Sequence, residues 1–188
     1  MEYKDSGSPD LLVLVDKGDN ILGYEEKEKC HLGKGMLHRA FSIFIFNSSG
    51  QLLLQERSAA KPLWPLFWSN SVCSHPRKGE DYMEAAQRRL KEEIGLETPL
   101  RSLFKFQYQA PFKTIGSENE LCVVFIGKSD EPVEINPQEI AEYRYVGLEE
   151  LEKDLRTRPN IYTPWFKMEW QRIRQNLKKD IDKLLKEV

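Results

Sequence analysis

Short apolar runs alternate with turn-forming residues along the chain, and this pattern predicts β-strands. Leucine and valine at residues 11–15 are followed by the polar turn DKGDN. Two further runs, 39–46 and 51–55, flank Asn-Ser-Ser-Gly, a sequence typical of a hairpin turn. We therefore expect a strand at 11–15, a hairpin over 39–55, and additional strands at 103–108, 121–126 and 143–146.

Charged and amphipathic segments between these runs predict helices. The segment 80–95 begins with Glu-Asp, which suits the positive end of a helix dipole, and ends at Gly95, where a left-handed residue is favoured. A longer amphipathic helix is expected over 163–186, because apolar residues recur there at three- and four-residue steps. Shorter helices are predicted at 25–29, 137–142 and 148–155.

The remaining segments are predicted to be irregular. Residues 1–9 read as a flexible polar tail, and the stretch between 108 and 121, with Pro111 and Gly116, reads as a loop. An aromatic loop over 60–72 carries Trp64 and Trp68, which either line a pocket or anchor the loop on the core. Strands interrupted by single helices, with no repeat or linker, predict one α+β domain over 1–188, with a mixed sheet covered by helices on both faces.

Composition narrows the class of protein. With 40% hydrophobic and 31% charged residues, the 188-residue chain is typical of a globular domain with a sizeable core. A net charge of −2 gives no electrostatic reason to bind nucleic acid or an anionic membrane. The three cysteines, Cys30, Cys73 and Cys122, show no CxxC spacing and favour a reducing compartment. The polar N-terminus is no signal peptide, so we expect a cytoplasmic protein.

The helix at 80–95 follows the spacing of a Nudix box, a loop–helix–loop module that holds divalent cations against a diphosphate. Glu80, Arg88, Glu92 and Glu93 occupy their places in that pattern, followed by Gly-Leu. Ser74 replaces the first glycine, and Arg89 replaces a glutamate of the metal cluster. A guanidinium at that place weakens a multi-metal hydrolytic site and adds a ligand suited to a diphosphate. Taken alone, the same residues also fit a solvated helix face with Arg–Glu pairs.

Histidines and paired carboxylates suggest a second kind of site. The chain has only three histidines, His31, His38 and His75. Glu118 and Glu120 lie two apart at the head of a predicted strand, so both face the same side and can converge on one ion. A mixed nitrogen and oxygen ligand shell suits Mn²⁺, Fe²⁺ or Mg²⁺, and Zn²⁺ also fits.

Together these motifs resemble the type 1 isopentenyl-diphosphate isomerases, over residues 27–165. The specific stretches are the histidine pair seven residues apart, SNSVCSHP at 69–76, the altered Nudix box, ENE at 118–120, and TPW at 163–165. The resemblance implies a Nudix-type mixed β-sheet sandwiched between helices. It also implies isomerisation of isopentenyl diphosphate to dimethylallyl diphosphate, by protonation and deprotonation through a tertiary carbocation, in isoprenoid biosynthesis.

The resemblance also implies roles for single residues. A divalent metal would be held by His31, His38, His75, Glu118 and Glu120. A second ion, Mg²⁺, would enter with the substrate diphosphate and meet Glu93 and the backbone carbonyl of Cys73. Cys73 and Glu120 would be the catalytic pair, and the preferred proton donor is Glu120 with Tyr108 nearby. The phosphates would be bound by Lys27, Arg57, Lys61 and Arg89.

Trp165 matches the family residue whose aromatic face stabilises the carbocation. Which of Cys73 and Glu120 donates the proton, and which metal occupies the histidine site, stay open. We expect a small isoprenoid diphosphate as the sole class of partner, and a monomer or weak dimer.

Three other functions compete with this one. A Nudix pyrophosphohydrolase acting on a nucleoside diphosphate derivative shares the fold but predicts glutamate at position 89 and gives Cys73 no task. A non-enzymatic metal-binding domain explains the histidines but neither Cys73 nor the basic residues. An inactive isomerase-like protein predicts a broken Cys or Glu, and the sequence retains both.

Overall fold

The computed structural model describes residues 11–176. The tail predicted over 1–9 lies outside the described residues, as does the part of the predicted C-terminal helix beyond residue 176. Within these residues nine strands form one mixed sheet with four α-helices, so the fold is α+β as predicted. The strands are β1 Leu11–Val15, β2 Ile21–Glu26, β3 His38–Phe46, β4 Leu52–Arg57, β5 Trp68–Ser69, β6 Val72–Ser74, β7 Leu100–Phe112, β8 Gly116–Lys128 and β9 Ile140–Val146.

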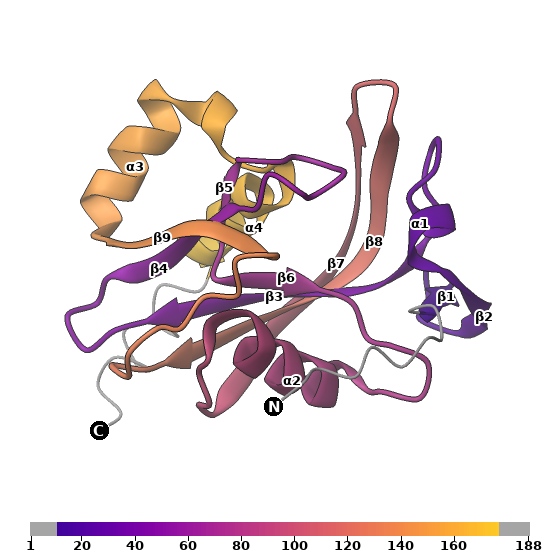
Figure 1. The fold of residues 1–188 in the computed structure, drawn as a ribbon, viewed down its shortest axis with the longest axis horizontal. Coiled ribbons are helices and arrows are strands. Elements are labelled where there is room, and N and C mark those ends of the chain that lie inside the picture. The colour runs from indigo at the N-terminus through magenta and orange to yellow at the C-terminus, as the bar shows by residue number, and fades with distance from the viewer. Residues whose placement is uncertain (1–10, 177–188) are drawn as a thin grey trace.

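Helices cover both faces of this sheet (Figure 1). Helix α2, Tyr82–Ile94, packs on one face, and α3, Leu148–Thr157, and α4, Pro164–Asn176, pack on the other. A short helix α1, Lys27–Cys30, joins β2 to the segment before β3, and one 3₁₀ turn, Pro159–Ile161, precedes α4. Within residues 11–176 no helix is long and apolar enough to cross a membrane.

Strand β3 shows why the sheet has two cores. Alternate side chains of a strand point to opposite faces. Phe44 and Phe46 therefore pack with the aromatic residues of α4, whereas Phe41, Ile43 and Ile45 pack against α2. Nearly continuous burial along β3 follows from this covering of both faces.

The pairing of β3 with β8 and β6 determines which side chains lie together in the candidate site. Strand β8 runs parallel to β3 on one side, with His38 opposite Glu120. Strand β6 runs antiparallel to β3, with Ser42 opposite Cys73. Side chains at positions 38 and 42 of β3 share the face that α4 covers, because they are separated by an even number of residues.

Helix α2 confirms the predicted start and end of the Nudix-box helix. Asp81 is its N-cap and forms a reciprocal capping box with Glu84, with side-chain to backbone distances of 2.8 and 3.0 Å. Gly95 has φ of +72° at the C-terminus, a left-handed conformation that residues with a Cβ rarely adopt. The helix of the Nudix box therefore begins and ends where its capping residues predict.

Several predicted boundaries were wrong. The strands predicted at 103–108 and 121–126 extend to Leu100–Phe112 and Gly116–Lys128, so Pro111 and Gly116 lie in strands instead of a loop. Long-range pairing between β7 and β8 continues through twelve residue pairs and overrides the local turn signals. Strand β2, which was not predicted, pairs with β1 despite its mostly exposed side chains.

The helix predicted at 137–142 is also wrong. Residues Ile140–Val146 form β9, which pairs antiparallel with β4. Only one helix-like turn precedes it, where the backbone N–H groups of Glu139 and Ile140 donate to the carbonyl of Asn136. Pairing with an existing strand supplies more hydrogen bonds to this segment than one isolated turn can.

Candidate active site

A cavity of about 420 Å³ opens between β3, β6, β8 and the 60–66 loop. Most of the predicted site residues line it: Lys27, His31, Arg57, Lys61, Cys73, His75, Tyr108, Glu118, Glu120 and Trp165. His38 is fully buried and contacts the same cluster. Arg89 and Glu93 are not among the lining residues and belong to a neighbouring group of charges.

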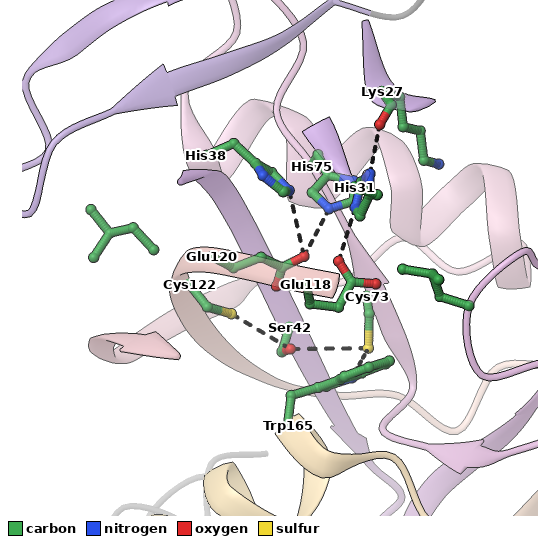
Figure 2. Close-up of polar contacts among 12 residues, drawn as sticks. Lys27, His31, His38, Ser42, Cys73, His75, Glu118, Glu120, Cys122 and Trp165 are labelled. Atoms are coloured by element: carbon green, nitrogen blue, oxygen red, sulfur yellow. Dashed lines mark hydrogen bonds and ion pairs between the residues drawn. The ribbon is translucent and has the colours of Figure 1, made fainter. Parts of the chain in front are cut away.

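Five of the predicted metal ligands converge. One ligand atom from each of His31, His38, His75, Glu118 and Glu120 lies within 4.8 Å of every other. Figure 2 shows the three imidazoles directed at the two carboxylates. His31 follows α1 as its C-cap, His38 begins β3, His75 directly follows β6, and the two glutamates lie on β8, so the sheet register brings them together. Strand pairing therefore brings together residues that lie up to 89 positions apart in the sequence.

A close backbone approach holds His31 in place. The backbone N–H of Ser117 donates to the carbonyl of His31 at 2.9 Å, and Leu32 forms a bridge with Gly116. A Cβ at Gly116 would lie 2.4 Å from the same carbonyl oxygen, so only glycine fits there. Gly116 thus sets the distance between the end of α1 and the carboxylates of β8.

The hydrogen bonds of the imidazoles define which ring nitrogens face the cluster. His31 Nδ1 lies 2.6 Å from the carbonyl of Lys27, and His38 Nδ1 lies 2.7 Å from the carbonyl of Met36. A carbonyl only accepts, so each Nδ1 carries the proton and, in the neutral ring, each Nε2 carries a lone pair. Those Nε2 atoms point to carboxylates, 2.9 Å from Glu118 for His31 and 3.7 Å from Glu120 for His38.

This arrangement of acceptors fits a divalent cation. In its neutral form His38 presents the lone pair of Nε2 to the Glu120 carboxylate, that atom is buried with no hydrogen-bond partner, and a positive ion between the two groups would relieve their repulsion. Burial, together with neighbouring His31, lowers the pKa of His38 to about 4, which favours the neutral ring that binds metals. Backbone carbonyls orient two of the rings, as is typical around metal-bound histidine.

The two carboxyl groups are electrostatically unlike. Burial would raise the pKa of Glu118, but the hydrogen bond and charge of His31 outweigh it and lower that pKa to about 2. Burial and the neighbouring Glu118 charge raise the pKa of Glu120 well above its usual value. Tyr108 donates a hydrogen bond to Glu120 Oε2 at 2.5 Å. The pKa values of the two carboxyl groups are therefore shifted in opposite directions, a pattern that suits an acid beside a charged neighbour.

Cys73 is surrounded by oriented polar groups. Its thiol donates to Asn70 Oδ1 at 2.8 Å, and its sulfur accepts from Trp165 Nε1 at 3.1 Å. The Asn70 amide is held the right way round because its Nδ2 donates to the carbonyls of Ile43 and Val72. Burial raises the pKa of the Cys73 thiol to about 12.

Trp165 lies between the sulfur and a buried cation. The Arg57 guanidinium lies 5.2 Å from the Trp165 ring centroid, and Trp64 packs edge-on against that ring at 5.2 Å. Arg57 itself donates to the carbonyls of Leu63 and Trp64 at 2.9 and 3.0 Å. Arg57 thus holds the aromatic loop while lining the cavity.

The Nudix-box residues form a compact ion-pair network. Arg89 Nη2 lies 2.6 Å from Glu93 Oε1 and 2.7 Å from Glu139 Oε1. Glu139 also pairs with Lys61, so the two cations predicted to bind phosphate share one carboxylate. Glu93 is buried, with its carboxylate bound by Arg89. In this arrangement Glu93 is not an open metal ligand.

Sequence reasoning missed several residues that shape the site. Asn70 lies inside the SNSVCSHP stretch, but its amide matters only because it is buried beside Cys73. Glu139 was predicted to lie in a helix, and no local signal indicates its pairs with Lys61 and Arg89. The tryptophans left open, Trp64 and Trp68, are not among the cavity-lining residues; Trp64 packs in the core and Trp68 lies 4.5 Å from the Arg144 guanidinium.

Known proteins resemble this chain in sequence and fold. The NUDIX domain family matches residues 36–166. An Isopentenyl-diphosphate Delta-isomerase 1 of Photorhabdus laumondii is 43% identical, covering 88% of this chain and 95% of that protein. An Isopentenyl-diphosphate Delta-isomerase of Pectobacterium atrosepticum is 41% identical, covering 86% of this chain and 90% of that protein. A solved structure from Deinococcus radiodurans has a TM-score of 0.69 at 25% identity, covering 86% of this chain and 98% of that one.

Sequence, fold and site geometry agree. The family match spans more than half of the chain, and two relatives above 40% identity align over nearly their whole length. The nine-stranded mixed sheet between helices is the fold that the resemblance implied. The chain therefore belongs to the isopentenyl-diphosphate Delta-isomerases, a family of NUDIX-domain proteins.

Proposed function

We propose that this protein converts isopentenyl diphosphate into dimethylallyl diphosphate, as a step of isoprenoid biosynthesis. The observation that carries the proposal is the placement of Cys73 and Glu120. Cys73 lies on β6, which pairs with β3, and Glu120 lies on β8, which also pairs with β3, and both line one cavity. Two proton-transfer groups on separate strands can therefore reach a five-carbon chain from different directions.

The reaction moves one double bond and changes no atom count. A proton is added to the terminal carbon of the alkene, which leaves a tertiary carbocation. Another proton is then lost from the carbon nearer the diphosphate. An unactivated alkene needs a well-placed acid, and the cation needs surroundings that stabilise charge without attacking it.

Glu120 is the proposed proton donor. Its pKa is raised well above the usual value, first by burial and then by the Glu118 charge, which favours the protonated form of this carboxyl group. Tyr108, at 2.5 Å from its Oε2, orients the carboxyl group. Burial also raises the pKa of Tyr108 well above its usual value, so this phenol keeps its proton and serves as a hydrogen-bond donor.

Cys73 is the proposed partner that removes the second proton. The indole N–H of Trp165 donates to its sulfur, which stabilises the thiolate relative to an unassisted thiol. Burial raises the pKa of Cys73 to about 12, so the group rests as a thiol and must lose its proton before it can accept one from the substrate, and the thiolate so formed is a strong base. Trp165 also presents its ring to the cavity and is the aromatic residue proposed to stabilise the carbocation.

The diphosphate is proposed to bind at the basic end of the cavity. Lys27, Arg57 and Lys61 line it, and Arg89 reaches the same group of charges through Glu139. Lys61 and Arg89 share Glu139 in this structure, so substrate phosphates exchange with that carboxylate when they bind. Phosphate oxygens make stronger charge-assisted hydrogen bonds than one shared carboxylate can.

Divalent metals complete the proposal. One divalent ion would be held by His31, His38, His75, Glu118 and Glu120, whose donor chemistry fits Mn²⁺, Mg²⁺, Zn²⁺ and Fe²⁺. That ion would fix the Glu120 carboxyl group and increase its acidity. Glu93 and the Cys73 carbonyl are proposed to meet a Mg²⁺ that arrives with the diphosphate. The Arg89–Glu93 pair would have to open first, so no proton transfer is assigned to that second ion.

The rival Nudix hydrolase accounts for less of the site. Position 89 carries arginine, whose guanidinium pairs with Glu93 and removes a carboxylate from the hydrolytic cluster. Cys73, with its oriented amide and indole partners, has no task in phosphate hydrolysis. We further propose that the chain acts as one unit over 1–188, in the cytoplasm, as a monomer or weak dimer with a small isoprenoid diphosphate as its partner.

A proton and phosphorus NMR time course tests the function. Purified protein is mixed with isopentenyl diphosphate, Mg²⁺ and a trace of Mn²⁺ in deuterated water. We expect dimethylallyl diphosphate to appear with deuterium incorporated and with both phosphates intact. Unchanged substrate from folded, metal-loaded protein would refute the isomerase. Phosphate release from nucleoside diphosphate derivatives in a parallel tube would support the hydrolase instead.

A further inference from the structure

A buried glutamate that the proposed reaction does not use lies behind Cys73. Glu169 has no exposed surface and lies on α4, whose aromatic residues belong to the core on the same face of the sheet. Its Oε1 accepts from the thiol of Cys122 at 3.5 Å, and Ser42 hydrogen-bonds its side chain. A fully buried carboxyl in an apolar core is costly unless it is neutral or well paired.

Ser42 connects this carboxyl to the catalytic sulfur. Its Oγ lies 4.0 Å from Cys73 Sγ and 3.7 Å from Cys122 Sγ, and Figure 2 shows it between the two sulfur atoms. The contact is built into the sheet, because Ser42 on β3 is the register partner of Cys73 on β6. Glu169, Ser42 and Cys73 thus form a continuous polar path from α4 into the cavity.

We propose that Glu169 is a positioning residue for the isomerase, acting on the sulfur of Cys73 through the hydroxyl of Ser42. Ser42 has one hydroxyl proton, which can be directed to only one acceptor. A Glu169 carboxylate would attract that proton and turn the hydroxyl away from the sulfur. A neutral Glu169 donates to Ser42 Oγ and leaves the Ser42 proton directed at Cys73.

Two observations indicate the neutral form. Glu169 Oε2 is buried and has no hydrogen-bond partner among the described residues, which is unfavourable for a carboxylate and is relieved by protonation. Burial raises the pKa of Glu169 to about 8, although Ser42, Cys122 and the charge of Arg172 oppose it. A charged Glu169 would also repel a thiolate at Cys73, so the neutral acid suits a base at that position.

Matched substitutions test this proposal, which rests on the isomerase function. Glu169→Gln keeps a neutral donor of the same shape, whereas Glu169→Leu removes it. We expect kcat to fall about tenfold in Glu169→Leu, from the loss of one oriented hydrogen bond, with KM within about twofold. Glu169→Gln should stay within about threefold of the unaltered protein. Ile173→Val, on the same helix and fully buried, serves as the packing control.

A double-mutant cycle asks whether the effect passes through Ser42. In a Ser42→Ala background, Glu169→Leu should add almost nothing, because the connecting hydroxyl is gone. Two losses that multiply would overturn the proposal, as would equal activity of Glu169→Leu and Ile173→Val. Equal losses in the Gln and Leu variants would overturn it too, since they would show that the hydrogen bond is not the cause.

A spectroscopic signature separates this proposal from the function itself. The S–H stretching band of Cys73, assigned by subtracting Cys73→Ala spectra in each background, reports the hydrogen bonds of that thiol. We expect this band to shift in Glu169→Leu and to stay in place in Ile173→Val. An unshifted band in Glu169→Leu overturns the proposal whether or not the unaltered protein isomerises isopentenyl diphosphate; lack of isomerisation alone refutes only the function.

Discussion

Two groups of charged residues adjoin the cavity, and they differ in how their charges are balanced. In the histidine and glutamate cluster, imidazole Nε2 atoms lie 2.9 and 3.7 Å from carboxylate oxygens. In the Nudix-box network, Arg89 and Lys61 neutralise Glu93 and Glu139 directly. The second group is already balanced, whereas in the first group the Nε2 of His38 is buried without a partner. The contrast fits the proposals that the first group holds a cation and that the second changes partners when a diphosphate binds.

The largest expected effect is on chemistry at the first group. Glu120→Gln retains the size of the side chain but cannot transfer the carboxyl proton, so we expect kcat to fall by about 10⁴-fold. Steady-state conversion of isopentenyl diphosphate, measured by NMR, provides the test. Glu131→Gln, at an exposed position outside the cavity, should keep full activity. A Glu120→Gln variant that retains a tenth of the activity would remove Glu120 from proton transfer.

Metal binding should separate the two groups. His38→Ala deletes a buried residue that we propose as a metal ligand, and we expect the affinity for Mn²⁺ in the absence of substrate to fall by about 100-fold. Arg89→Gln should leave that affinity unchanged, because Arg89 contacts only the second group. Isothermal titration calorimetry of both variants measures the difference. Equal losses would mean that the two groups form a single metal site.

Substrate binding should show the reverse dependence. Lys61→Gln and Arg89→Gln each remove a proposed phosphate ligand, so KM should rise about tenfold while kcat stays within about threefold. Lys91→Gln, on the same helix as Arg89 but exposed and paired with Glu97, is the matched control. A fall in kcat at constant KM would place these cations in the chemical step instead.

The smallest expected effect is on stability. Burial would raise the pKa of Glu139, but the charges of Lys61 and Arg89 outweigh it and lower that pKa to about 2. A folded-state pKa below the unfolded value contributes stability above about pH 4.5, which is lost as the pH falls through about 2. Glu139→Gln should therefore be less stable by about 1 kcal/mol at pH 7 and equally stable near pH 2.

Urea unfolding of the unaltered protein and Glu139→Gln between pH 2 and 7 measures this difference. A constant gap across that range would mean that Glu139 stabilises the fold by packing and not by charge. Equal free energies of unfolding of the two proteins at pH 7 would mean that Lys61 and Arg89 need no carboxylate partner at position 139. That result would contradict the balanced network.

Local pattern predicted much of the fold correctly. The apolar run at 11–15 and the run at 39–46 are strands β1 and β3, and Asp81 and Gly95 bound the predicted Nudix-box helix. The pattern failed where pairing overrode it: Pro111 and Gly116 lie in long strands, and Ile140–Val146 pairs with β4 instead of beginning in a helix. Turn and helix signals are local, whereas strand pairing is decided by partners distant in sequence.

The candidate site, like the fold, was predicted only in part from the sequence. The sequence showed the candidate ligand residues and the arginine at position 89 of the Nudix box, because residue identity and spacing are local properties, and the resemblance grouped the five candidate ligands. Only the tertiary structure placed His38 opposite Glu120, paired Glu139 with two cations, and set Ser42 and Glu169 behind Cys73. Those relations depend on sheet register, which decides which side chains are neighbours. They also depend on burial, which shifts the pKa values of buried groups toward their neutral forms.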